Sequence, residues 1–293
     1  MKKYIGEIML CITAIIWGSG FVVSAVSLEY YTPYQVLAGR FLVGFIILSI
    51  IFYKKLRGLN RSIILKGFVL GALLYVAFAL QTVGLQYTTP SKNAFLTAVN
   101  VVIVPFIAFL AYKRKIDKFE LTGAILAIVG IGFLSLQFST DVNIGDLLTL
   151  GCAVGFAYQI FYTAKYVKDE DPITLTIIQM FFAAILACIV VLFKGEVNFS
   201  MELEAVSSIF YLGIFSTTIA YLFQTIAQKF TSETKTAIIL STESFWGMVF
   251  SIILLGEVLT PRMIIGAILI LCAIIISETK LSFMKKSRLE KLI

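Results

Sequence analysis

The residue of this sequence whose chemistry stands out is Glu243, near the middle of the stretch from Lys235 to Gly256. A helix over that stretch is long enough to cross the hydrocarbon core of a bilayer, roughly 30 Å thick, which puts Glu243 close to mid-membrane. A lone carboxylate at that depth is costly and usually faces a cavity or a partner. Two interpretations stay open: an acid with a functional role, or a neutral, protonated Glu that is hydrogen-bonded to a neighbouring helix.

Uncharged polar and aromatic side chains recur three or four residues apart in other apolar stretches, a spacing that puts them on one face of a helix. Each such face either binds something or joins helices by hydrogen bonds. A tryptophan several turns from a helix end, as here, either packs in the core or forms an aromatic wall for a ligand. The candidate substrate-binding residues are Trp17, Tyr75, Gln81, Asn93, Asn100, Tyr158, Tyr221, Gln224 and Trp246, and Glu243 is the candidate proton-coupling residue.

Several kinds of chemistry lack the residues that they need. The sequence has no His, and Cys11, Cys152, Cys188 and Cys272 each stand alone in an apolar run, so neither a metal site nor a cofactor is predicted. No GxxxxGK[ST] motif is present for an ATP-driven pump. An intramembrane enzyme is not expected, because the sequence contains neither an HExxH motif nor a His that could activate a Ser. A channel is not expected either, because no ring of like residues is present.

The elements that position these residues are predicted to be membrane helices. Of the 293 residues, 59% are hydrophobic and 14% are charged, and the mean hydropathy is +0.96. A soluble domain carries about a quarter charged residues. We therefore predict an all-α integral membrane protein with ten transmembrane helices, over residues 7–27, 34–52, 67–86, 91–112, 120–137, 146–165, 173–193, 206–227, 236–256 and 261–278.

The basic residues indicate how these helices are oriented. If the N-terminus is cytoplasmic, 20 of the 24 Lys and Arg residues fall in cytoplasmic segments, and only Lys92, Lys194 and Arg262 fall outside. The positive-inside rule then predicts a multi-pass protein of the plasma membrane with both termini cytoplasmic. Arg40 lies within the second helix, about two turns from its outer end, where anchoring by snorkelling is favoured over contact with a substrate.

The basic residues also bear on the partners of the protein. They fall between apolar segments and are not interleaved with aromatic residues, so the net charge of +7 does not predict a nucleic-acid partner. The expected partners are the lipid bilayer, a small-molecule substrate and protons. The oligomeric state stays open, and a monomer is compatible with the sequence.

The second half of the chain repeats the first. The aligned pairs are Gly6-Glu7 with Gly145-Asp146 and Pro33 with Pro172, at an offset of 139, then Gln81-Thr82 with Gln224-Thr225, Thr88 with Thr231, and Lys92 with Lys235, at an offset of 143. Because five helices per repeat is an odd number, the second copy enters the membrane from the opposite side, as is typical of transporters. The predicted divisions are a first five-helix repeat (1–138), a second inverted five-helix repeat (139–280) and a basic cytoplasmic tail (281–293).

The repeat pairs Asn100 in the fourth helix with Glu243 in the ninth. In inverted copies these positions lie at similar depth and could face each other, one neutral and one titratable. Pro105 leaves the carbonyl of Val101 without its helical donor and should kink the fourth helix there. Met248 takes the place of Pro105 in the second half, so the halves are expected to differ in flexibility.

Four stretches of the chain form a recognisable set: WGSGF from Trp17 to Phe21, the TP…R pattern of Pro33 and Arg40, QTVGLQYTTPSKNAFLTAVNVVIVP from Gln81 to Pro105, and QKFTSETKTAIILSTESFWGMVFSIILLGEVLT from Gln228 to Thr260. Together they resemble the EamA-like family of the drug/metabolite transporter superfamily. The resemblance covers essentially the whole chain. It implies two inverted bundles around a cavity lined mainly by helices 1, 3, 4, 6, 8 and 9, alternating access by rocking of the halves, and export as the commoner direction.

From these features we expect a secondary active transporter that moves a small organic metabolite, with an amino acid or an amine favoured, by alternating access coupled to protons. Desolvation favours the protonated form of Glu243, so a proton and a cationic or polar substrate can compete for one site. The scarcity of deep cations disfavours an anionic phosphate ester. A facilitative carrier or exchanger for another metabolite, such as a nucleobase-like compound, stays open as the alternative.

Overall fold

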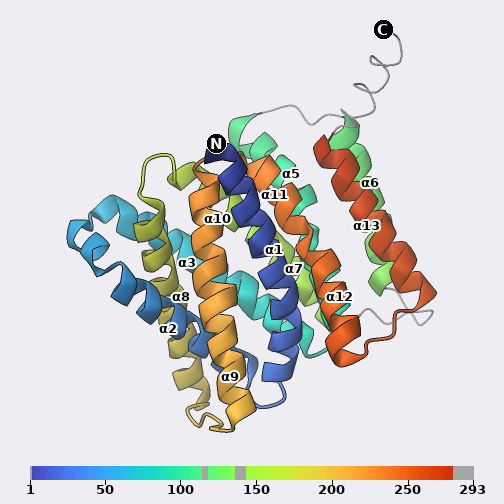
Figure 1. The fold of residues 1–293 in the computed structure, drawn as a ribbon. Helices are drawn as coiled ribbons and strands as arrows, with labels where there is room; N and C mark the ends of the chain where they lie inside the picture. Colours follow the sequence, from blue (N-terminus) through green and yellow to red (C-terminus); the bar gives the residue numbers. More distant parts are fainter. Residues whose placement is uncertain (1, 114–117, 136–142, 280–293) are drawn as a thin grey trace.

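The computed structural model describes residues 2–113, 118–135 and 143–279. Within these ranges the regular structure is helical, without a strand, and the helices pack side by side in a bundle (Figure 1). The predicted tail at 281–293 lies outside the described residues. The protein is therefore an all-α, multi-pass membrane protein.

Ten stretches of helix in the described residues correspond to the ten predicted crossings. Seven are continuous: α1 (Lys2–Ser27), α2 (Pro33–Ile51), α3 (Arg61–Leu85), α6 (Lys118–Ser135), α7 (Ile144–Tyr166), α8 (Pro172–Lys194) and α13 (Pro261–Thr279). Three are interrupted: α4 (Pro90–Ala98) with α5 (Asn100–Tyr112), α9 (Leu203–Tyr211) with the π-helical η2 (Leu212–Ile219) and α10 (Ala220–Gln228), and α11 (Glu233–Ser241) with α12 (Glu243–Leu255). A short 3-10 helix, η1 (Tyr53–Gly58), follows α2. Eight crossings are long and apolar enough to span a bilayer, and α6 and α13 contain shorter apolar runs that complete the two repeats.

The first residues of equivalent helices show why they begin where they do. Thr32 directly precedes Pro33, and its side chain accepts a hydrogen bond from the backbone N–H of Gln35. Asp171 precedes Pro172 in the same way and accepts a hydrogen bond from the backbone N–H of Thr174. These side chains satisfy donors that a helix start leaves open, and proline at the first helical position is pre-set for the helix. The prolines that align in the sequence therefore open equivalent helices, α2 and α8.

Each repeat packs its first helix against the other repeat. Helix α1 lies against α10, α11 and α12, whereas α7 lies against α3, α4 and α5. Helices α2 and η2 also pack together, as do α8 and α3. These contacts define two groups of mixed origin, group A (α1, α2, α9, η2, α10, α11, α12) and group B (α3, α4, α5, α7, α8), which meet where α2 packs on α8 and α12 packs on α4. Helices α6 and α13 pair with each other at the edge of the bundle (Figure 1).

Two ion pairs at equivalent positions hold these exchanged helices. Lys235 pairs with Glu7 within group A, and Lys92 Nζ lies 3.6 Å from Asp146 Oδ2 within group B. Both acids belong to the first helix of a repeat and both lysines belong to the fourth, as the sequence alignment pairs them. Thr88 also donates a 2.6 Å hydrogen bond to Asp146. The two pairs occupy opposite ends of inverted copies and differ in burial.

The fourth and ninth crossings are interrupted at equivalent residues, Val99 and Thr242. At each, the helix tightens for one residue: Val99 N–H bonds to the carbonyl of Leu96 at 3.3 Å, and Thr242 N–H bonds to that of Ile239 at 3.2 Å. Helix α5 continues through Pro105. The kink predicted at the carbonyl of Val101 lies two residues from the interruption at Val99, but the equivalent interruption at Thr242 occurs without a proline, so the interruption itself does not require Pro105.

The difference in burial between the ion pairs predicts unequal stability effects. The side chain of Asp146 is 1% exposed and that of Lys92 is 11% exposed, against 24% for Glu7 and 39% for Lys235. Lys92→Met should lower the free energy of unfolding by about 3 kcal/mol, because it leaves a buried carboxylate unpaired. The equivalent Lys235→Met should cost about 0.5–1 kcal/mol. Thermal unfolding of both variants in one detergent measures the difference.

A double variant provides the control for this prediction. Adding Asp146→Asn to Lys92→Met removes the stranded charge and should recover part of the lost stability. Equal losses for the two lysine variants, or no recovery in the double variant, would show that the burial of Asp146 does not govern its cost.

Candidate functional site

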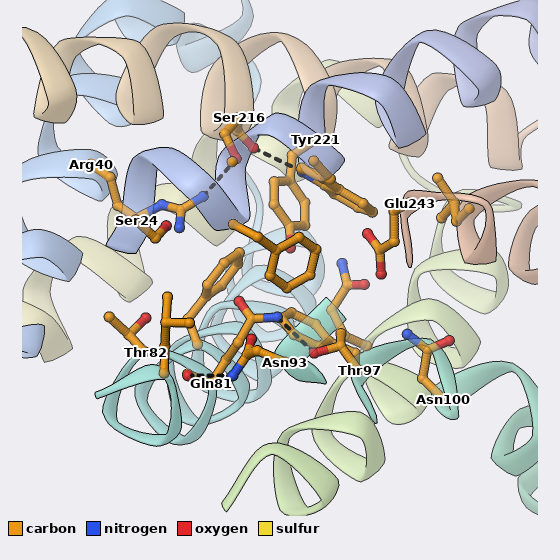
Figure 2. Close-up of a pocket in the computed structure, with 18 of the residues that line it drawn as sticks. Ser24, Arg40, Gln81, Thr82, Asn93, Thr97, Asn100, Ser216, Tyr221 and Glu243 are labelled. Atoms are coloured by element: carbon orange, nitrogen blue, oxygen red, sulfur yellow. Dashed lines mark hydrogen bonds between the residues drawn. The ribbon is translucent and has the colours of Figure 1, made fainter. Parts of the chain in front are cut away.

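The site is a cavity of about 600 Å³, including its open mouth, between groups A and B (Figure 2). Group A contributes Trp17, Gly20, Phe21, Ser24, Arg40, Ser216, Tyr221, Leu240 and Glu243, and group B contributes Phe78, Gln81, Thr82, Leu85, Asn93, Thr97, Asn100, Phe156, Gln159 and Ile160. These residues come from crossings 1, 3, 4, 6, 8 and 9, which the family resemblance places around a cavity, and from crossing 2. The charged residues belong to group A and the side-chain amides to group B.

Glu243 faces this cavity from the first position of α12, directly after the interruption at Thr242. The residue is 5% exposed, and no described residue donates a hydrogen bond to its carboxylate or forms an ion pair with it. The interpretation of a protonated Glu bonded to a neighbouring helix thus finds no partner in the described part of the chain. Its repeat equivalent Asn100 lines the same cavity at the first position of α5.

Aromatic rings form a continuous wall next to Glu243. The ring of Trp17 lies 4.9 Å from that of Tyr221, and Tyr221 lies 6.1 Å from Phe78 between centroids. Phe78 in turn meets Phe156 at 5.0 Å in an edge-to-face arrangement. The indole Nε1–H of Trp17 donates a 2.9 Å hydrogen bond to the carbonyl of Ser216, which fixes the ring. Such a wall can bind an apolar group or, through its faces, a cation.

The side-chain amides of group B already make some hydrogen bonds within that group. Gln81 Nε2–H donates to Thr97 Oγ1 at 3.0 Å, and Asn93 Nδ2–H donates to Thr149 Oγ1 at 2.8 Å and to the carbonyl of Gln81 at 3.2 Å. The buried Oδ1 of Asn93 has no hydrogen-bond partner among the described residues. Asn100 is 6% exposed, and its side chain makes no hydrogen bond to the described residues. Asn93 and Asn100 therefore offer unused polar atoms to a ligand.

Arg40 lines the cavity too, contrary to the prediction that it snorkels. Its side chain is buried, with the whole residue 2% exposed. The guanidinium donates from Nε to Thr217 Oγ1 and from Nη2 to Ser216 Oγ, both at 3.0 Å, and lies 4.1 Å from the ring centroid of Phe78. Sequence position alone suggested anchoring, because the residue lies near a helix end. The default for an ionisable residue within a membrane helix is function, and that signal was available.

Four of the candidate residues lie outside the cavity lining. Tyr75 packs in the core formed by α2, α3 and α8, and Tyr158 stacks on Tyr162 with centroids 6.4 Å apart. Trp246 packs between Phe245 and Phe250. Gln224 lies just behind the wall, where its Nε2–H donates to Oε1 of the lining residue Gln159 at 3.2 Å. The cavity thus brings together Trp17, Gln81, Asn93, Asn100, Tyr221 and Glu243 of the predicted set.

Sequence reasoning missed other lining residues besides Arg40. Ser216 belongs to the π-helical segment η2, where Thr218 Oγ1 donates to the carbonyl of Gly213, five residues back, at 2.8 Å. The sequence carries no pattern that predicts a π-helical segment, although such segments often occur at functional sites. The described residues contain no group of three or more His, Cys, Asp or Glu that could hold a metal ion.

Comparisons with known proteins agree with this architecture. The EamA-like transporter family matches the chain twice, over residues 4–136 and 143–279. An uncharacterized transporter of Archaeoglobus fulgidus is 33% identical over 276 residues, covering 94% of this chain and 86% of the relative. The uncharacterized transporter YyaM of Bacillus subtilis is 25% identical over 289 residues, covering 94% of each. A crystal structure described only as that of a protein shares the fold, with TM-score 0.68 and 15% identity over 92% of this chain and 95% of that chain. The chain belongs to the EamA-like transporter family.

Proposed function

We propose that this protein is a secondary active transporter of a small organic metabolite with a basic amino group, an amino acid or an amine, and that proton binding at Glu243 drives transport. The observation that carries the proposal is the carboxylate of Glu243, which is buried at a cavity between two groups of helices and has no partner among the described residues. Membership of a transporter family supports transport in general. The substrate class and the coupling are argued from the side chains.

The coupling follows from what Glu243 can bind. An ionised carboxylate in a site poor in water is costly unless a proton or a cation is present. If a proton and the amino group of the substrate compete for Glu243, the carrier changes face with either one bound. It does so less readily when Glu243 is charged and unpaired. Such competition is sufficient to exchange protons for substrate.

The moving parts are proposed to be groups A and B, in place of the two halves of the sequence. The cavity lies between these groups, and the ion pairs Glu7–Lys235 and Lys92–Asp146 each lie within one of them. Rocking one group against the other would therefore open the cavity to either side without breaking these pairs. Rigid-body closure of this kind is a common form of conformational change around a ligand.

The lining supports an amino-group substrate over a phosphate ester. Trp17 and Tyr221 offer aromatic faces to a cation next to Glu243, whereas Arg40 is the single Lys or Arg residue that lines the cavity in the described part of the chain. We further propose that the protein lies in the plasma membrane with both termini cytoplasmic, from the distribution of Lys and Arg, and that it exports its substrate. If the rate of transport does not depend on a pH gradient, the protein is instead a facilitative carrier.

Glu243→Gln should keep the fold and abolish pH-driven accumulation. Gln resembles the protonated acid, so the protein loses the exchange of a proton and keeps the shape of the site. The assay is uptake into proteoliposomes driven by a pH gradient, with the amino acid or amine that most stabilises the wild-type protein in a thermal-shift panel. Glu233→Gln, in the same crossing and outside the cavity, is the matched control and should accumulate substrate normally.

The opposite result is informative as well. If proteoliposomes with Glu243→Gln still concentrate the substrate under a pH gradient alone, Glu243 is a structural residue and the coupling lies elsewhere.

Asn100→Ala should weaken binding and leave the pH dependence of transport in place. Asn100 offers an amide at the cavity but no group that titrates, so its loss removes about one hydrogen bond, or roughly a threefold to tenfold change in affinity. Gln86→Ala, on the exposed end of α3, is the control and should bind like the wild type. A loss of pH dependence in Asn100→Ala would show that Asn100 and Glu243 act as one unit.

A further inference from the structure

Arg40 has more hydrogen-bonding capacity than the protein uses. A guanidinium has five N–H donors, and the bonds to Thr217 and Ser216 occupy two of them. One face of the guanidinium lies over the ring of Phe78. The remaining donors belong to a side chain that lines the cavity (Figure 2). Arg40 therefore presents unused, directional donors to whatever enters.

The charge of Arg40 is also unbalanced. No carboxylate of the described residues forms an ion pair with it, and its partners Ser216 and Thr217 are neutral hydroxyls. A buried charge in a membrane protein is normally paired or faces a substrate pathway. Hydroxyls and an aromatic face reduce the cost of the cation, but they supply no negative charge. The missing partner is an anion that the cavity can admit.

We propose that Arg40 binds the carboxylate of the transported substrate, so that the substrate is an amino acid whose ammonium group points toward Glu243. The inference rests on the proposed function and deepens it, because an amine without a carboxylate would leave Arg40 unpaired. Figure 2 shows Arg40 and Glu243 on opposite sides of the cavity with Tyr221 between them. A zwitterion in this position satisfies both charges at once.

A carboxylate fits Arg40 better than a phosphate does. The planar guanidinium matches the two oxygens of a carboxylate, and one positive charge balances one negative charge. A phosphate monoester carries up to two negative charges, and Lys92, which precedes the lining residue Asn93, already pairs with Asp146. The site therefore selects a singly charged anionic group.

The hydrogen-bond partners of Arg40 have no counterparts at the equivalent positions of the other repeat. Ser216 and Thr217 lie in the π segment η2, and the same segment supplies the carbonyl that holds Trp17. At the repeat offset of 143 their equivalents are Leu73 and Leu74, and at the offset of 139 the equivalent of Arg40 is Gln179. The contact between Arg40 of the first half and the two hydroxyls of the second half therefore has no counterpart among the equivalent residues. A contact that serves only the common fold would be expected at both equivalent places.

The simpler alternative is that Arg40 only joins α2 to η2. The two roles differ in one measurable way: a joining role lowers the affinity for every ligand equally, whereas a carboxylate-binding role lowers it only for ligands with a carboxylate. The test therefore compares matched ligands and not merely matched variants.

The probes are the twenty common L-amino acids, each with its α-amide, which keeps the ammonium group and removes the negative charge. Binding to the purified full-length protein in detergent is followed by tryptophan fluorescence. In the wild type, an amino acid that binds should do so at least tenfold more tightly than its amide. In Arg40→Gln the amino acid should bind roughly tenfold to a hundredfold more weakly, and the amide should change less than threefold.

Two further variants control for structure. Arg40→Lys keeps the charge without the planar fork and should retain part of the preference for the acid over the amide. Thr217→Val removes one support of the guanidinium and should weaken the acid more than the amide, but less than Arg40→Gln does. The inference is overturned if no amino acid binds, if wild-type protein binds acid and amide equally, or if Arg40→Gln weakens both equally. The wild-type comparison decides the matter even if Arg40→Gln does not fold.

Binding in detergent needs no gradient, so the two proposals can fail separately. If Arg40 governs the preference for the acid but proteoliposomes show no proton-driven transport, only the proposed function is wrong. If an amine without a carboxylate is transported with protons and Arg40→Gln leaves this unchanged, only the present inference is wrong.

Discussion

The cost of an unpaired charge away from water governs this structure. Glu7 and Asp146 each lie in the first helix of a repeat, and each is paired with a lysine from the fourth helix of the opposite repeat. Glu243 and Arg40 are both buried but have no ionic partner among the described residues. Both of these face the same cavity, and no other Asp, Glu, Lys or Arg of the described residues lines it. The pairing of charges therefore separates the residues that join helices from those that we propose bind a ligand.

The exchange of first helices between repeats gives that separation its geometry. Because α1 packs on α10–α12 and α7 packs on α3–α5, each packing group contains helices from both halves of the chain. The cavity lies along the seam between these groups, with both charges on group A and the side-chain amides on group B. A movement of one group against the other would change how the charges face the amides. Binding and movement are then linked through one interface.

Much of the fold could be predicted from the sequence, because the length and hydropathy of each apolar stretch indicate that it crosses the membrane. Length and hydropathy located ten crossings, and the aligned Pro33 and Pro172 marked equivalent helix starts. The site was predicted less completely. Helical periodicity identifies the polar face of a helix, but not the neighbour that it meets, so Tyr75, Tyr158 and Trp246 were included although they are half-buried against other side chains outside the cavity lining. Arg40 was assigned to anchoring because its distance from a helix end was the single quantity that the sequence offered.

The interruptions at Val99 and Thr242 share a backbone geometry but are followed by different side chains. Pro105 was the obvious sequence signal for a kink near Val101, yet the interruption at Val99 recurs at Thr242, where Met248 stands in the position of the proline. The interruption therefore belongs to the shared geometry of the repeat and does not require the proline. What differs between the copies is the next residue, Asn100 in one and Glu243 in the other, each at the first position of a half-helix on the cavity wall. Two similar backbones thus present an amide and an acid to the same space, and only the acid can exchange a proton. The asymmetry that the proposed proton coupling requires would then come from side chains placed on a similar pair of backbones.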